Sequence, residues 1–255
     1  MRLSYYLNEG RSKPLTHDET IKLLENCTNS FSMSQKYPIY RGFNNGVTES
    51  YFIDPSKFTR RSMNTDNYYT LLMDGLPDWK NYPKRSKSII CTTDIVYAGD
   101  YGEAYNVFPF DGANIAVCNA ADIWGGFKKN IHHLKWFNKC LNEIADELGI
   151  ITSLYRAMSY DDIINVLNEI DKRKNELDIK RIWRRTNKEK FFDRYFSQYN
   201  DRSLVELIIE AFNPDKNGFK LYTPKTFNVK GNHEVWTDSP SVLIHYKSVS
   251  NYIIL

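Results

Sequence analysis

The chain has 255 residues, of which 42% are hydrophobic and 25% are charged, an ordinary balance for a globular protein. Its formal net charge of +3 is too small to identify a nucleic-acid-binding protein. The first residues lack the apolar stretch of a signal peptide, and no apolar run reaches the length of a membrane span. We therefore expect a soluble cytoplasmic protein with no membrane partner.

The cysteines and histidines do not form a recognisable metal site. No CxxC pair, the usual zinc signature, exists among the four cysteines, which are Cys27, Cys91, Cys118 and Cys140. The histidines form no HExxH motif, and adjacent His132 and His133 would leave a helix on different sides. We expect neither a bound metal nor a disulfide framework.

Several helices are predicted by the residues that would cap their N-termini. Thr16 with Glu19, and Ser203 with Glu206, each form a capping box, and Ser159 is followed by an acidic first turn. Thr65 is a candidate cap for a further short helix. The predicted helices cover residues 16–27, 65–72, 94–103, 130–148 (ended by Gly149), 159 onward and 203–212.

The predicted strands lie on both sides of the helical middle. They are short runs of bulky and β-branched residues over 37–42, 87–93, 105–108, 114–118, 231–236, 241–246 and 249–255. The order of helix, strands, helices and strands predicts an α+β fold. We expect one domain over residues 1–255, with a mainly helical insertion over 122–213.

Three short motifs carry candidate chemistry. Arg41 lies in the sequence Tyr-Arg-Gly at the end of the first predicted strand, and its guanidinium is a planar fork of donors that suits phosphate oxygens. The second motif, Cys91-Thr92-Thr93, ends the next strand with two hydroxyls. In the third, the two-residue period of a strand places Asn232 and Glu234 on the same face.

Taken together, these motifs resemble the arginine, serine-threonine-serine and glutamate motifs of the ADP-ribosyltransferases, a family with bacterial toxin and bacteriophage members. The resemblance covers residues 38–118 and 228–255. It implies an α+β fold in which split, mixed or antiparallel β-sheets surround an NAD cleft. It also implies cleavage of the nicotinamide–ribose bond of NAD, as a substrate, and transfer of ADP-ribose to a protein or nucleic-acid acceptor. If the source is viral, the location would be the host cytoplasm.

The resemblance assigns roles to individual residues. It implies that Glu234 and Arg41 are catalytic, and that NAD is bound by Arg41, Gly42, Cys91, Thr92, Thr93, Tyr101 and Asn232. Cys91 stands where the family has a serine, and Asn232 stands where it often has Glu or Gln. Arginine-modifying members use Glu at that second position, so their specificity is not implied.

Other interpretations remain open at this stage. The chain could be a catalytically inactive module of the same family, such as a viral or phage factor, that binds a host protein or nucleic acid. Cys91 could instead be a nucleophile paired with His233 or His245. Two polar stretches are either solvated surfaces or binding sites. The first would form an outer NAD site from the donors Arg60, Arg61, Asn64, Asn67 and Arg85. The second would bind nucleic acid through the basic segment 171–190 with its aromatic residues Trp183, Phe191 and Phe192.

Overall fold

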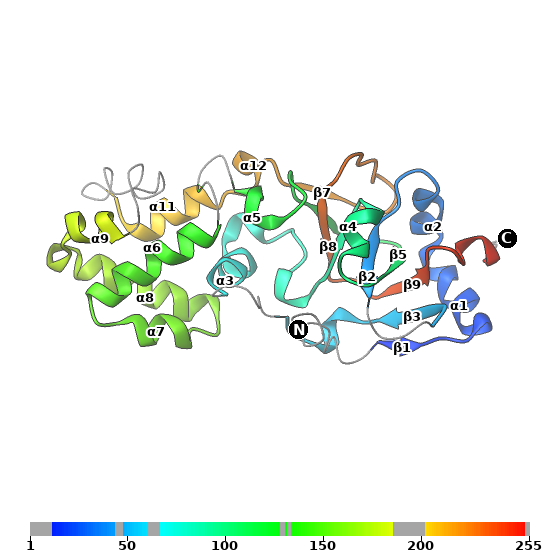
Figure 1. Ribbon diagram of the computed structural model, residues 1–255, viewed down its shortest axis with the longest axis horizontal. Helices are drawn as coiled ribbons and strands as arrows, with labels where there is room; N and C mark the ends of the chain where they lie inside the picture. Colours follow the sequence, from blue (N-terminus) through cyan, green and yellow to red (C-terminus); the bar gives the residue numbers. More distant parts are fainter. Residues whose placement is uncertain are drawn as a thin grey trace. The chain divides into compact units, whose positions relative to one another are not determined.

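The computed structural model describes residues 12–43, 48–60, 67–127, 131, 134–185 and 202–252, apart from the side chain of Trp183. The chain divides into two compact units (Figure 1). The sheet unit comprises residues 1–60, 82–122 and 219–255, and the helical unit comprises residues 61–81 and 123–218. The predicted α+β class is confirmed.

The described residues of the sheet unit form nine strands in the order β1-β3-β9-β5-β2-β4-β8-β6-β7, and every pairing among them is antiparallel. Their bounds are β1 Lys13–Pro14, β2 Tyr40–Phe43, β3 Ser50–Ile53, β4 Ile89–Thr92, β5 Glu103–Pro109, β6 Ile115–Val117, β7 Lys220–Tyr222, β8 Glu234–Thr237 and β9 Ser241–His245. The described strands thus form one continuous sheet, whereas the resemblance implied split sheets. The join at its centre is narrow, because the residue pair between β2 and β4 is Tyr40 with Thr92.

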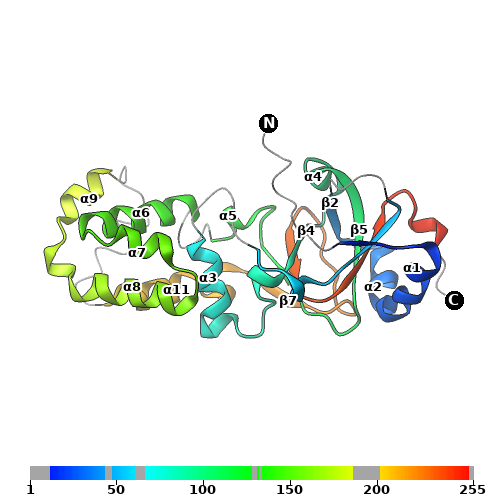
Figure 2. The ribbon, with the colours of Figure 1, turned by 90° about the horizontal axis from the view of Figure 1, so that it is seen from below.

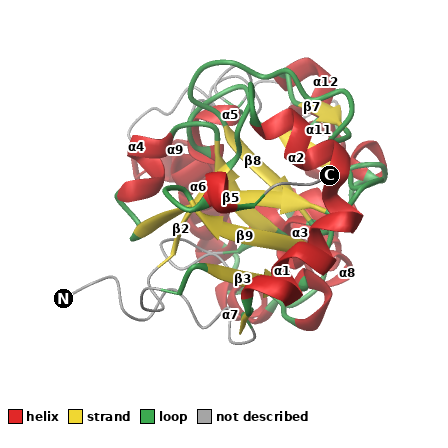
Figure 3. Ribbon diagram, turned by 90° about the vertical axis from the view of Figure 1, so that its right-hand side faces the viewer, coloured by secondary structure: helices red, strands yellow, loops and turns green. Residues whose placement is uncertain are grey.

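Both faces of this sheet are covered by apolar side chains. Along β5, Tyr105 and Val107 belong to one buried cluster, with Cys91 and Val235 from the neighbouring strands. Phe108 belongs to the other cluster, which contains Leu24 and Cys27 from the N-terminal helices. Figure 3 shows β5, β9 and β3 side by side, with helices α1 (His17–Leu24) and α2 (Thr28–Ser34) beside them. Alternate residues of each strand therefore pack on opposite sides of the sheet.

Short helical segments complete the sheet unit. They are η1 Glu25–Cys27, η2 Pro55–Lys57, η4 Arg85–Lys87, α4 Ile95–Gly99 and η6 Val249–Asn251. The capping box that opens α1 is confirmed, since Thr16 Oγ1 accepts from the backbone N–H of Glu19 and Glu19 Oε2 accepts from that of Thr16. Helix α4 is shorter than the predicted 94–103 and is capped by the Asp94 carboxylate.

The predicted C-terminal strand over 249–255 is wrong for its described part. Residues 249–251 form a 3₁₀ turn, in which the backbone N–H of Tyr252 donates to the carbonyl oxygen of Val249. The ring of Tyr252 is buried and stacks on His17, with 4.8 Å between ring centroids. A turn satisfies these contacts because it brings Val249 and Tyr252, three residues apart, to one side. Residues 253–255 lie outside the described residues.

The described helices of the helical unit are α3 Tyr68–Gly75, η3 Pro77–Trp79, α5 Ile123–Gly126, α6 Leu134–Glu147, α7 Ile151–Arg156, α8 Tyr160–Lys172, η5 Lys174–Glu176, α9 Ile179–Arg185, α11 Leu204–Ala211 and α12 Pro214–Asn217. Figure 2 shows α6, α7, α8 and α11 gathered side by side. The capping box predicted at Ser203 is present, Ser159 forms a further capping box with Asp162, and Gly149 follows α6 with a positive φ. The unit takes in nearly all of the predicted insertion, and it adds residues 61–81; a single domain over the whole chain stays a prediction.

Candidate functional site

The strand register aligns three side chains across the centre of the sheet. Tyr40 of β2 pairs with Thr92 of β4, and Thr92 pairs with Glu234 of β8. Directly paired residues of antiparallel strands project from the same face. Tyr40, Thr92 and Glu234 therefore form one row, although 194 positions separate the first from the last (234 minus 40).

The end of β4 is joined to the segment that leads into β8 by side-chain hydrogen bonds. Thr92 Oγ1 donates to Asn232 Oδ1 at 3.3 Å. Thr93 Oγ1 donates to the carbonyl oxygen of Gly231 at 2.6 Å and accepts from the backbone N–H of His233 at 2.9 Å. Both hydroxyls of the second motif are thus used to fix the third motif. The structure brings Thr92, Thr93, Asn232 and Glu234 together.

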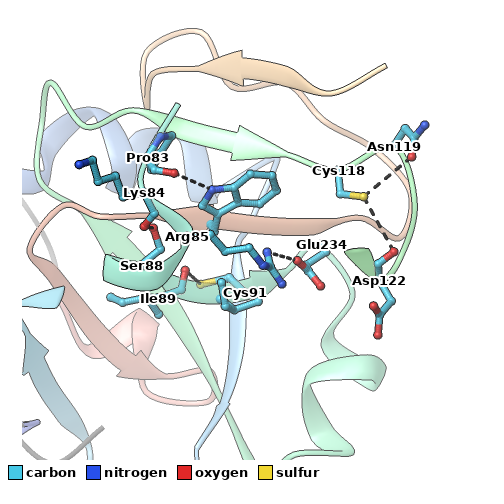
Figure 4. A network of polar contacts seen from close by, with 12 residues as sticks. Pro83, Lys84, Arg85, Ser88, Ile89, Cys91, Cys118, Asn119, Asp122 and Glu234 are labelled. Atoms are coloured by element: carbon cyan, nitrogen blue, oxygen red, sulfur yellow. Dashed lines mark hydrogen bonds and ion pairs between the residues drawn. The ribbon is translucent and has the colours of Figure 1, made fainter. Parts of the chain in front are cut away.

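Glu234 is a buried carboxylate with a basic partner. Its side chain is 10% exposed, and Arg85 Nη1 lies 2.5 Å from its Oε1 (Figure 4). Arg85 is also buried, at 4% exposure, and its guanidinium carbon lies 5.3 Å from the centroid of the Trp236 ring. The indole N–H of Trp236 donates to the carbonyl oxygen of Pro83 at 3.0 Å. The carboxylate therefore lies in an environment of low dielectric constant beside a fixed positive charge.

From the sequence, Arg85 was expected only among the donors of an outer NAD site. Its contact with Glu234 was not predicted. Arg85 lies in η4, which immediately precedes β4, and the register of β4 against β8 brings η4 close to Glu234 and Trp236. From the sequence alone, a polar stretch that contains Lys84, Arg85 and Lys87 is expected to be solvated surface. Only the pairing of β4 with β8, which local sequence does not encode, reveals the contact.

Arg41 occupies a different position from the other motif residues. It follows Tyr40 on β2 and pairs with Tyr105 of β5, so its side chain starts on the face opposite Thr92 and Glu234. Its side chain is partly buried, and Nη1 donates to the carbonyl oxygen of Ile90 on the adjacent β4. Arg41 thus lies next to the second motif, but the described contacts do not join it to Glu234.

Cys91 belongs to the apolar core. It pairs with Val235 and lies with Ile89 and Tyr105 in the larger buried cluster, because it alternates with Thr92 along β4. A buried thiol packs as a small hydrophobic side chain. The structure therefore gives Cys91 a packing role, which differs from the NAD contact that the resemblance implied. It also means that the missing serine hydroxyl is not needed to bind residues 231–233, since Thr92 and Thr93 do so.

The proposed pairing of Cys91 with a histidine gains no support from the contacts of either imidazole. His233 Nδ1 lies 2.9 Å from the carbonyl oxygen of Cys118, and His245 Nε2 lies 3.3 Å from Glu103 Oε2. Cys118 is likewise no candidate nucleophile, because burial and the nearby Glu234 carboxylate raise the pKa of its thiol to about 12. A thiol with that pKa is protonated at neutral pH and is a poor nucleophile.

Two tyrosines lie near the row. Tyr101, just after α4, is 50% exposed, and its ring meets that of Tyr97 edge-on at a centroid distance of 6.0 Å. Burial raises the pKa of Tyr97 well above its ordinary value, with smaller contributions from Tyr101, Asp122 and Glu234. Tyr97 is thus a neutral phenol at any working pH. The exposed face of Tyr101 is available for stacking on a flat ligand.

Gly42 has a packing role that the structure makes explicit. A Cβ atom built on Gly42 would lie 2.0 Å from the carbonyl oxygen of Ala98 and 2.8 Å from Tyr101 Cβ, because α4 lies directly against β2. The NAD contact that the resemblance implied for Gly42 stays a prediction. Close approach of α4 is a sufficient reason for glycine at this position.

We expect Gly42→Ala to destabilise the protein by about 1–3 kcal/mol, because α4 must shift to admit the methyl group. Urea-induced unfolding followed by circular dichroism measures the change. Gly99→Ala is the matched control, since a Cβ on Gly99 would have no heavy atom within 4 Å. Equal midpoints for the two variants would contradict the packing role of Gly42.

The basic segment of the helical unit is extensively ion-paired. Arg181 Nη1 lies 3.3 Å from Glu147 Oε1, and Arg185 Nη1 lies 3.6–3.8 Å from Glu143, Asp146 and Glu147. Arg173 pairs with Glu176. These contacts favour the interpretation of a solvated helix face. The expected aromatic residues Phe191 and Phe192, like Arg61, Asn64, Thr65, His132 and His133, lie outside the described residues.

Across the described ranges, no group of three or more His, Cys, Asp or Glu side chains is arranged to hold a metal ion. In the same part of the chain, no helix combines the length and the apolar character needed to cross a membrane. The chain matches no model of a known protein family, no curated protein and no solved structure.

Proposed function

We propose that the chain is an NAD-dependent mono-ADP-ribosyltransferase that cleaves the nicotinamide–ribose bond and transfers ADP-ribose to a macromolecular acceptor. The observation that carries this proposal is the register of Thr92 with Glu234, supported by the contact of Thr92 with Asn232. The three motifs of the resemblance lie on adjacent strands, β2, β4 and β8. The register supports the proposal because it pairs Thr92 with Glu234, residues that are widely separated in the sequence.

Glu234 has the chemistry that the reaction requires. Departure of nicotinamide leaves positive charge on the ribose, in an oxocarbenium-like transition state. A carboxylate that accepts a hydrogen bond from a ribose hydroxyl stabilises that charge, and a buried position strengthens the interaction. Thr93 holds the backbone of Gly231 and His233 in place, and Thr92 holds the side chain of Asn232. The carboxylate of Glu234 is therefore presented from a fixed strand end.

Arg41 would bind the NAD phosphates. Its guanidinium now donates to the neutral carbonyl oxygen of Ile90. Charge-assisted hydrogen bonds to phosphate are stronger than bonds to a neutral carbonyl, so NAD can compete for the guanidinium. NAD is a substrate in this scheme, and none of the steps calls for a metal. The acceptor would be a protein or a nucleic acid, as for a phage or viral effector in a host cytoplasm.

One observation favours a second candidate function. The Glu234 carboxylate already has an arginine partner at 2.5 Å, and such a pair could hold the carboxylate away from any ligand. The chain would then be a catalytically inactive module of the same family that binds a host protein or nucleic acid. The two functions differ in whether NAD is consumed.

The test is incubation of the purified chain with NAD labelled in its adenosine half and a cell lysate as the source of acceptors. Release of nicotinamide and attachment of label to macromolecules are expected. Arg41→Ala is expected to weaken the interaction with NAD by about 1.5–3 kcal/mol, the value of hydrogen bonds to a charged group. An intact NAD pool at millimolar concentration, with folded protein, would leave the inactive module as the function.

A further inference from the structure

The ion pair between Arg85 and Glu234 is not explained by stability. Both side chains are at least nine-tenths buried, at 4% and 10% exposure, and their closest atoms are 2.5 Å apart. Removing two charges from water is expensive, and apolar residues of similar volume often stabilise a protein at least as well. A buried pair of this kind therefore calls for another reason, such as fixing the position of a functional group.

Arg85 is held rigidly enough to fix its partner. Its guanidinium lies over the ring of Trp236, which is two residues after Glu234 on β8 and so shares its face of the sheet. The Trp236 indole is itself hydrogen-bonded to the carbonyl oxygen of Pro83. These contacts connect the loop before β4 to β8 around the carboxylate (Figure 4).

The neighbours of Arg85 in the chain are fixed as well. Ser88 Oγ donates to the carbonyl oxygen of Lys84 at 2.7 Å. The backbone N–H of Lys84 donates to Asp238 Oδ2 at 3.3 Å, just beyond the end of β8. The turn η4 is thus tied at both ends, so Arg85 reaches Glu234 from an ordered backbone. Rigid supporting residues of this kind hold a reactive group within the narrow tolerance that catalysis requires.

We propose that Arg85 is the positioning residue for Glu234: it fixes the orientation of the carboxylate and supplies its permanent counter-charge, without contacting NAD itself. The inference rests on the proposed function. Arginine keeps its charge at any working pH, so the counter-charge that Arg85 supplies is permanent. An ionised carboxylate accepts hydrogen bonds at both oxygens, so binding of Arg85 at Oε1 is compatible with a ribose hydroxyl at the group.

This role makes a kinetic prediction that a purely structural role does not. If Arg85 orients Glu234 for the transition state, its loss lowers kcat and leaves the KM for NAD nearly unchanged, because ground-state binding is made elsewhere. If Arg85 instead blocks the carboxylate, its removal raises kcat. A contribution to folding alone would lower the amount of native protein without changing kcat per folded molecule.

The experiment compares steady-state NAD cleavage by the wild type, Arg85→Lys, Arg85→Met and the control Lys84→Met, which removes one charge from the exposed neighbouring side chain. Circular dichroism and cooperative unfolding identify the folded fraction. We expect kcat to fall roughly 10–100-fold for Arg85→Met, with a smaller fall for Arg85→Lys, which keeps the charge but loses the planar fork. Lys84→Met is expected to match the wild type. If Arg85→Met does not fold, the kcat of Arg85→Lys relative to the wild type decides whether Arg85 has the positioning role.

Unchanged or increased kcat in the folded Arg85 variants would overturn the positioning role while leaving the proposed function intact. A wild type that leaves NAD intact would overturn the proposed function, and the positioning role with it. The two failures are distinguished by the activity of the wild type alone.

Discussion

Glu234→Gln is expected to lower the rate of NAD cleavage by roughly 10²–10³-fold, the effect of removing a single preorganised group that stabilises transition-state charge. The substitution keeps the size of the side chain and removes its negative charge. Because Arg41 is expected to bind the NAD phosphates, the KM for NAD should change much less than kcat. Nicotinamide release, measured by chromatography over a range of NAD concentrations up to saturation, gives both constants.

The control for this variant is Glu25→Gln, which makes the same chemical change at an exposed position on η1. It should retain the activity of the wild type. Folding of Glu234→Gln must be verified, since the change leaves the buried Arg85 charge without its anionic partner. A folded Glu234→Gln protein with wild-type turnover would remove Glu234 from the catalytic role.

Arg85→Met is expected to destabilise the protein by about 3–5 kcal/mol, since it leaves a buried carboxylate without its counter-ion. The double variant Arg85→Met with Glu234→Gln should recover much of that loss, because both charges are then gone. Urea-induced unfolding of the two single variants and the double variant gives the coupling free energy directly.

The comparison for this effect is Arg202→Met, which breaks the pair of Arg202 with Glu210 in the helical unit. Its side chains are 35% and 41% exposed, so the pair is screened by solvent and should contribute only ~0–1 kcal/mol. An Arg85→Met protein that is destabilised no more than Arg202→Met would show that the buried pair is energetically unimportant.

The helices could be read from the sequence where their signal is local. The capping boxes at Thr16 and Ser203 consist of residues three positions apart, and Ser159 is followed at once by its acidic first turn; each of the three opens a helix in the structure. The short strands β1, β3 and β7 escaped prediction, because two to four residues carry too little periodicity. The strand expected over 249–255 failed for a tertiary reason, namely the docking of Tyr252 against α1.

The candidate site was readable only in part. The order of the motifs suggested that residues 91–93 and 232–234 belong together, and the register of β4 with β8 places Thr92 beside Glu234. Side chains alternate between the two faces along each strand, so Cys91 and Arg41 lie on the face opposite the row of Tyr40, Thr92 and Glu234. The Arg85–Glu234 contact joins residues 149 positions apart, and no local pattern predicts such a contact.

The most direct test of the site is a crystal structure of Glu234→Gln, in which turnover is slowed, grown with saturating NAD. A hydroxyl of the nicotinamide ribose is expected within hydrogen-bond reach of the side chain at position 234, with the phosphates at Arg41. NAD bound with its nicotinamide ribose away from β4 and β8, or no NAD bound at saturation, would contradict the proposed site.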